Sequence, residues 1–148
     1  MTDLELASEI ARRAHAGQKD RGGHDYVTHP QAVADKVETE TQKVVAMLHD
    51  VAENTPVTLG SLRVLFGDEI AGAVGLLTHA DGIGYMDYVA AIRGNPLAEV
   101  VKNADLEHNM ELSRLSREPS DADRRRLEKY RKALELLNEK TRLAVDGQ

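Results

Sequence analysis

The residues best suited to chemistry in this sequence are His49 and Asp50, followed one helical turn later by Glu53 and Asn54. A helix advances about 100° per residue, so side chains four positions apart share a face. In a helix these four side chains would form one polar arc, opposite an apolar arc. Imidazole and carboxylate groups in this arrangement can hold a metal ion or move protons. The solvated face of an ordinary amphipathic helix has the same pattern, so both interpretations stay open.

A second polar stripe lies far along the chain. Lys102, Asp105 and Asn109 are spaced i, i+3 and i+7, which puts an ammonium, a carboxylate and an amide on one helix face. An intrahelical Lys102–Asp105 pair, worth about 0.3 kcal/mol, is an equally good account of this stripe alone. A third candidate group for chemistry is the imidazole of His29, which directly precedes Pro30 at a predicted helix start. Two histidines and two aspartates would offset the charge of a divalent ion and leave positions open for water.

The segments that must position these groups all have helical patterns. Capping residues, apolar residues at helical spacing, and Gly and Pro at the boundaries predict helices at about 3–17, 30–37, 41–54, 58–66, 68–77, 85–93, 96–110 and 120–140. No segment alternates polar and apolar residues as a half-buried strand does. The sequence therefore predicts an all-α fold, a compact bundle of about seven or eight helices in a single domain over residues 1–148.

Composition excludes several classes of protein. The 148 residues include no cysteine, which rules out disulfides, thiolate metal sites and a cysteine nucleophile. The first nine residues are polar and acidic and no long apolar run follows, so we expect neither a signal peptide nor a membrane span, and a cytoplasmic protein. A formal charge of −6 argues against duplex nucleic acid as a partner. A small anionic ligand remains compatible, because a metal ion and a few local cations can reverse the potential inside one cleft.

The motifs resemble a known family. His29, the pair His49-Asp50 and the distant Asp105 look like the H…HD…D signature of the HD superfamily. More narrowly, five blocks resemble the hydrolase domain of RelA/SpoT-type proteins and the free-standing small alarmone hydrolases: AHAGQ (14–18), YVTHP (26–30), LHDVAENT (48–55), FG (66–67) and VKNADLEHN (101–109). The HD pair alone is a weak signal, whereas five blocks in order from about residue 10 to 110 are a strong one.

This resemblance implies a metal centre and a reaction. The family's ligands match His29, His49, Asp50 and Asp105, which would hold one divalent ion, commonly Mn²⁺, with Fe, Zn, Co or Mg as alternatives. The ion would carry the water that acts as nucleophile. The characteristic family reaction removes the 3′-diphosphate from guanosine tetra- or pentaphosphate and releases pyrophosphate. The implied partner is a small nucleotide polyphosphate, and the sequence makes no prediction of oligomeric state.

The remaining family positions predict catalytic and substrate-binding residues. The family's Glu-Asp pair, which handles the attacking water, falls on Glu53 and Asn54. Asn54 departs from the pattern, because an amide can orient water but cannot act as a general base. Asp20 stands where larger relatives often carry an arginine that stacks on guanine, so adenosine analogues remain open as substrates. The substrate-binding candidates are Lys19, Arg21, Tyr26, Lys102, Asn109 and Arg114.

Two other functions stay open. One is a nucleotidase or an NADPH phosphatase that releases orthophosphate, and the other is a nucleotide or metal sensor weakened at Asn54. We expect His15 to support the site by hydrogen bonding. The other histidines and a pair of tyrosines are predicted to be surface, structural or packing residues: His24, His79, His108, Tyr85 and Tyr88.

Overall fold

The structure is a computed structural model that describes residues 1–114 and 120–139, apart from the side chains of residues 113 and 114. Within these ranges the regular elements are helices, accompanied by one isolated β-bridge between Lys19 and Asp25. The prediction of an all-α fold is confirmed. The helices are α1 (Asp3–Ala14), α2 (Thr28–Asp35), α3 (Glu40–Leu48), α4 (Val51–Asn54), α5 (Leu59–Phe66), α6 (Asp68–Leu77), α7 (Tyr85–Ile92), α8 (Pro96–Arg114) and α9 (Asp121–Asn138).

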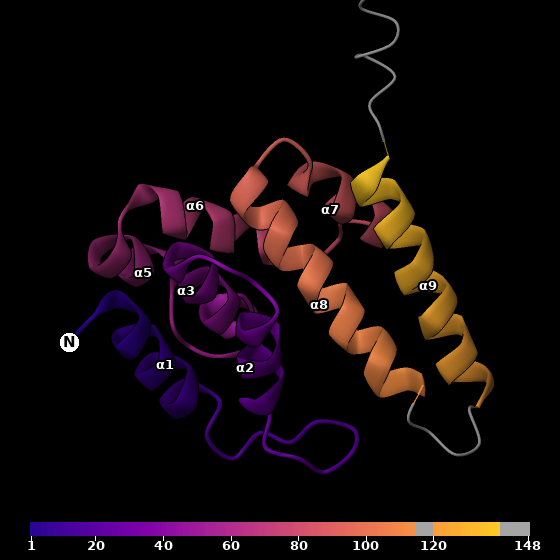
Figure 1. The fold of residues 1–148 in the computed structure, drawn as a ribbon, viewed down its shortest axis with the longest axis horizontal. Coiled ribbons are helices and arrows are strands. Elements are labelled where there is room, and N and C mark those ends of the chain that lie inside the picture. Colours follow the sequence, from indigo (N-terminus) through magenta and orange to yellow (C-terminus); the bar gives the residue numbers. More distant parts are fainter. Residues whose placement is uncertain (115–119, 140–148) are drawn as a thin grey trace, which may run out of the picture.

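Helix α3 lies at the centre of the bundle (Figure 1). It packs against α1, α2, α6 and α8, and α5 packs against α6. The long helix α8 runs past α2 and α3 and carries α9 along its other side, where α9 also contacts α7. Helix α8, which is distant in the sequence from α2 and α3, therefore meets both of them in the interior.

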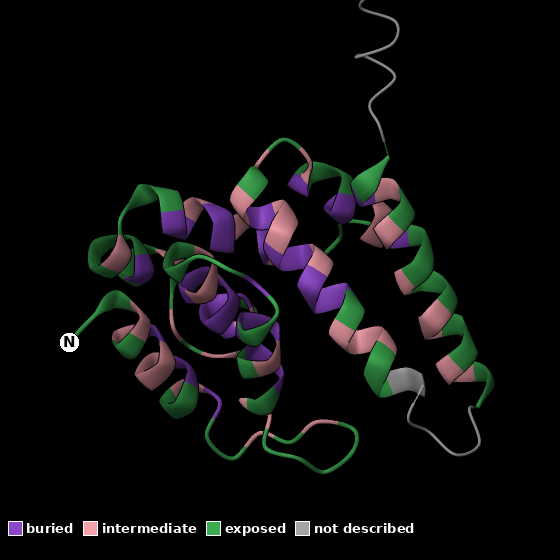
Figure 2. Cartoon of the chain, viewed as in Figure 1, coloured by how far each residue is buried: buried purple, intermediate pink, exposed green. Residues whose placement is uncertain are grey.

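Burial explains the central place of α3. Residues 44–48 are all buried, so this helix is enclosed on every side rather than along one stripe (Figure 2). The outer helix α9 is mostly exposed and buries only Ala133 and Leu137. None of the described helices combines the length and apolar character needed to cross a membrane.

Local capping sets most helix boundaries where the sequence predicts them. The side chains of Thr2, Thr58 and Ser120 each accept a backbone N–H three residues on, as N-cap residues do. Such a cap stabilises a helix by about 1 kcal/mol. Helix α6 instead begins at Asp68 without a side-chain cap. Its N-cap is Gly67, whose φ of +92° lets the chain leave α5 and enter α6 directly.

The predicted continuous helix over residues 41–54 is wrong, because it is interrupted at His49 and Asp50. Helix α3 ends at Leu48 and α4 begins at Val51. The backbone N–H and ring Nδ1 of His49 both contact the carbonyl of Ala46, at 3.4 and 2.5 Å. Asp50 has φ −105° and ψ −2°, which depart from the dihedral angles of a regular α-helix. The interruption takes both side chains off the regular helical face, and the His49 side chain is only 2% exposed.

Candidate metal centre

Three segments of the chain bring imidazole and carboxylate groups together in the interior. His29 comes from the first turn of α2, His49 from the α3–α4 junction, and Asp105 from the middle of α8. Nε2 of His29 lies 2.8 Å from Oδ1 of Asp105, and Nε2 of His49 lies 3.4 Å from the same oxygen. One ligand atom from each residue falls within 4.8 Å of the others. This spacing suits three ligands of one divalent ion.

Asp50 adds a second carboxylate to this cluster. Its Oδ2 lies 3.2 Å from Nε2 of His49 and 3.8 Å from Nε2 of His29. The same oxygen accepts a hydrogen bond of 2.8 Å from the hydroxyl of Tyr26, which the sequence proposes as a substrate-binding residue. The structure therefore brings the four residues of the predicted ligand set together and directs the Tyr26 hydroxyl to one of them.

The donor atoms fit a divalent cation. Nδ1 of His49 is directed at the Ala46 carbonyl, which favours the tautomer with its proton on Nδ1 and a lone pair on Nε2. That Nε2 is buried and has no hydrogen-bond partner among the described residues. A buried lone pair facing the carboxylates of Asp50 and Asp105 is unfavourable unless positive charge lies between them. Nitrogen and oxygen ligands are those that divalent transition metals bind.

The electrostatics of the cluster reflect the same requirement. Burial alone would lower the pKa of His49, but the carboxylates of Asp50 and Asp105 outweigh it and hold that pKa well above its usual value. Burial would likewise raise the pKa of Asp105, but the ammonium of Lys102 and the neighbouring imidazoles hold it well below its usual range. The carboxylates therefore favour positive charge at His49, whereas the surrounding cations favour the ionised form of Asp105.

Two substrate-binding candidates on α8 contact Asp105 itself. The ammonium of Lys102 donates to Oδ2 of Asp105 at 2.9 Å, and both side chains are 8% exposed. The amide of Asn109 donates to Oδ1 at 3.2 Å. The intrahelical pair suggested by the i, i+3 spacing is therefore present, but it is buried. These contacts fix the orientation of the Asp105 carboxylate toward the two histidines.

His108 is a neighbour of the cluster that the sequence analysis treated as a surface or structural residue. Its ring stacks on that of His29 with centroids 5.0 Å apart, and the two Nδ1 atoms are separated by 2.7 Å. One of these nitrogens must donate and the other accept. The position of His108, one helical turn after Asp105 on α8, was the available signal for this contact.

The predicted catalytic pair lies at the edge of the cluster. Glu53 is exposed, and its Oε1 accepts a hydrogen bond of 2.6 Å from the backbone N–H of His79. Asn54 is also exposed, and its backbone carbonyl accepts a hydrogen bond of 3.0 Å from the side-chain amide of Gln18. Gln18 in turn contacts Nδ1 of His15 at 3.0 Å. His15 thus supports the segment that carries Asn54 through hydrogen bonds, as the sequence suggests.

The loop candidates are held by local contacts. Lys19 forms an ion pair with Asp25 across the β-bridge. Asp20 accepts two backbone N–H bonds of 2.9 Å within the loop, which leaves the exposed Arg21 near the tip. Arg114, the last predicted substrate-binding residue, ends α8, and its side chain lies outside the described residues. The structure therefore engages Lys19 within the loop and leaves Arg21 exposed to solvent.

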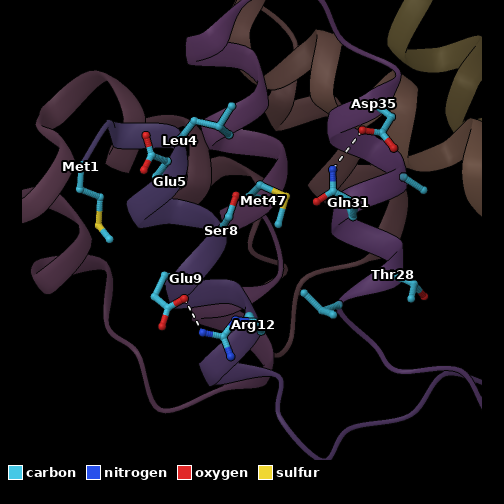
Figure 3. Close-up of a pocket in the computed structure, with 12 residues that line it drawn as sticks. Met1, Leu4, Glu5, Ser8, Glu9, Arg12, Thr28, Gln31, Asp35 and Met47 are labelled. Atoms are coloured by element: carbon cyan, nitrogen blue, oxygen red, sulfur yellow. Dashed lines mark hydrogen bonds and ion pairs between the residues drawn. The ribbon is translucent and has the colours of Figure 1, made fainter.

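A groove of about 680 Å³ lies elsewhere, between α1 and α2 (Figure 3). Leu4 and Ser8 form one wall, Gln31 lies on the other, and Met47 also contributes to the lining. None of the residues that line it belongs to the predicted site. The groove is therefore not part of the metal centre.

Comparisons with known proteins point to one family of domains. A family model described as "HD domain" matches residues 7–142. The chain is 36% identical over 124 residues to a probable GTP pyrophosphokinase of Mycobacterium leprae, an alignment that covers 75% of this chain and 16% of the relative. It is 34% identical over 123 residues to the bifunctional (p)ppGpp synthase/hydrolase SpoT of Escherichia coli, covering 72% and 17%. The chain thus spans about one sixth of the length of these relatives.

A solved structure has the same fold. It belongs to a metazoan ortholog of SpoT, described as hydrolysing ppGpp and playing a role in starvation responses. The two superpose with a TM-score of 0.79 over 94% of this chain and 87% of the other, at 21% sequence identity. At this level of identity the likeness establishes a shared fold.

Proposed function

Because this chain belongs to the HD domain family, we propose that it is a cytoplasmic, metal-dependent phosphohydrolase that removes the 3′-diphosphate of a guanosine or adenosine polyphosphate and releases pyrophosphate. The observation that carries the proposal is the convergence of His29, His49 and Asp105 around a buried, unpartnered Nε2 of His49. The similarity to the hydrolase SpoT of Escherichia coli supports this choice of substrate.

The proposed ligands are His29, His49, Asp50 and Asp105, and the proposed ion is Mn²⁺. When bound, such an ion supplies an activated water and offsets charge on the attacked phosphoryl group. Lys102 and Asn109 orient the Asp105 carboxylate by hydrogen bonding. Tyr26 does the same for Asp50. Partners of this kind commonly change metal affinity when they are removed.

Glu53 is the proposed general base, with Asn54 beside it as a residue that orients the attacking water. The Glu53 carboxylate lies one turn after His49 and is held at its Oε1 by the His79 N–H, which fixes its direction. A carboxylate can accept a proton from the water, whereas the amide of Asn54 can only donate and accept hydrogen bonds. In the unsubstituted protein, only Glu53 of this pair can therefore accept the proton.

The test is incubation of purified protein with Mn²⁺ and guanosine 3′,5′-polyphosphates, adenosine 3′,5′-polyphosphates or NADPH, with each product identified. Pyrophosphate release from a 3′,5′-polyphosphate, lost on chelation of the metal, is the expected outcome. Orthophosphate release from NADPH would replace this proposal with a phosphatase. Tight nucleotide binding without turnover of any compound would identify a sensor instead.

Asn54→Asp is expected to raise kcat by roughly a hundredfold, because it adds a carboxylate where the amide offers no basic group. The rate constant is measured at saturating Mn²⁺ and nucleotide, with Asn54→Ala as the matched comparison. Loss of activity in the alanine variant would support the water-orienting role of the amide. An aspartate variant with full metal content and unchanged kcat would contradict the assignment of this position to the attacking water.

His108→Ala is expected to weaken Mn²⁺ binding by roughly 10- to 100-fold, because the His29 ring loses the partner that fixes its orientation. His108→Asn keeps a polar group near Nδ1 and should retain more of the affinity. Calorimetric titration of the metal-free protein measures both, with the exposed His24→Ala as control. Equal affinities in all these variants would mean that His108 plays no part in holding the ion.

A further inference from the structure

The ring of Tyr85 lies between two lysine side chains from different helices. The ammonium of Lys102 on α8 is 5.8 Å from the ring centroid, and that of Lys129 on α9 is 4.4 Å from it. Lys129 also lies 5.4 Å from the centroid of Tyr130. Cation–π contacts of this kind hold a lysine side chain in place while its ammonium stays accessible. Because both ammonium groups approach one ring, they lie within about 10 Å of each other.

The two ammonium groups differ in their partners. Lys102 is paired with Asp105, whereas no carboxylate oxygen of the described residues lies within 4.0 Å of the Lys129 ammonium. Four other basic residues of α9 each have such a partner on the same helix: Arg124, Arg126, Arg131 and Lys132. Arg125 and Lys129, the other two basic residues of this helix, have no such partner among the described residues, and Lys129 differs from Arg125 in lying over two tyrosine rings.

The surroundings of Lys129 are cationic. Burial, followed by the charges of Lys102, Arg21 and Arg126, lowers the pKa of Lys129. These cations come from α8, from the loop before α2 and from α9 itself. The chain as a whole carries a formal net charge of −6, so this local positive charge is opposite in sign to the net charge of the protein. Local positive potential next to a metal centre attracts anionic ligands.

We propose that Lys129, held between Tyr85 and Tyr130, forms a second anion subsite for a phosphate group of the nucleotide other than the one attacked at the metal centre. The inference rests on the proposed function. Lys102 connects the metal centre to the proposed subsite, because its ammonium contacts both Asp105 of the cluster and the Tyr85 ring. The substrate already proposed, a nucleoside with phosphate groups on two separate ribose hydroxyls, offers such a second phosphate group. A lysine ammonium binds such a phosphate as a point charge.

Two compounds with the same scissile group test the subsite: guanosine with diphosphates on both the 3′ and 5′ positions, and guanosine 3′-diphosphate with a free 5′-hydroxyl. Lys129→Gln is expected to raise KM for the first by roughly fivefold, as fits an exposed charge contact. The KM for the second and both kcat values should change less than about twofold. Lys129→Arg, which keeps the charge, should have the same KM for the first compound as the unsubstituted protein.

The matched control is Lys132→Gln, which removes an exposed lysine of the same helix that already has a carboxylate neighbour, Glu128. It should leave KM unchanged for both compounds. An equal rise in both KM values for Lys129→Gln would mean that Lys129 only packs against the tyrosines. Unchanged KM values in that variant would also overturn the subsite.

The test remains decisive if the unsubstituted protein turns over neither compound. The proposed function then fails, and the subsite is judged from the dissociation constants of the same two nucleotides, measured by calorimetry. Weaker binding of the doubly phosphorylated compound alone in Lys129→Gln is the outcome that supports it. Equal affinities in the variant and the unsubstituted protein, or no binding of either nucleotide to the latter, would overturn it.

Discussion

His49→Gln is expected to abolish stoichiometric Mn²⁺ binding and to lower kcat by roughly a thousandfold or more. The imidazole of His49 is fully enclosed, and its unpartnered Nε2 faces both carboxylates of the cluster. Glutamine occupies a similar volume but presents an amide, which is a poor ligand for this class of ion. Metal content after gel filtration and turnover of the nucleotide measure the two effects.

The exposed His24 provides the control, since His24→Gln makes the same chemical change on the surface loop. That variant should keep its metal and its activity. Circular dichroism should show that both variants remain helical. A helical His49→Gln protein that still retains one Mn²⁺ per chain would refute the assignment of His49 as a ligand.

Lys102→Met is expected to lower the free energy of unfolding of the metal-free protein by about 3 to 5 kcal/mol. The substitution leaves the Asp105 carboxylate buried without the ammonium that lies 2.9 Å away. With saturating Mn²⁺ the loss should be smaller, because an ion beside Asp105 supplies compensating positive charge. Urea denaturation with chelator and with Mn²⁺ measures the two values.

Lys132→Met is the comparison, because Lys132 forms a solvent-exposed pair with Glu128. Removing that pair should change the free energy of unfolding by less than about 1 kcal/mol in either condition. If Lys102→Met destabilised the protein by the same amount with and without Mn²⁺, the ion could not lie next to Asp105. The proposed ligand set would then have to be changed.

The sequence predicted the helices well because their ends depend on neighbouring residues. Thr58 and Ser120 cap helices through hydrogen bonds that reach only three residues along the chain. The interruption at His49 and Asp50 was missed, because the apolar spacing continues across it and gives no local sign of a break. The cluster contacts of both residues involve groups from α2 and α8, which a local pattern does not contain.

The four proposed ligands were predicted together, and the structure brings them together. What the sequence did not provide was the neighbours on which their orientation depends. The contact between His108 and His29 spans 79 positions, and that between Tyr26 and Asp50 spans 24. The Lys129 contacts were likewise hidden, since they depend on how α9 lies against α7.

The contact between His29 and Asp105 closes a loop of 76 positions, with helices α3 to α7 folded between its ends. Bringing the ends of such a loop together costs about 4 kcal/mol of chain entropy. An ion shared by the two residues would act as a reversible cross-link across that loop. Its capture would be coupled to the completion of folding, and a fragment lacking either end could not assemble the same site.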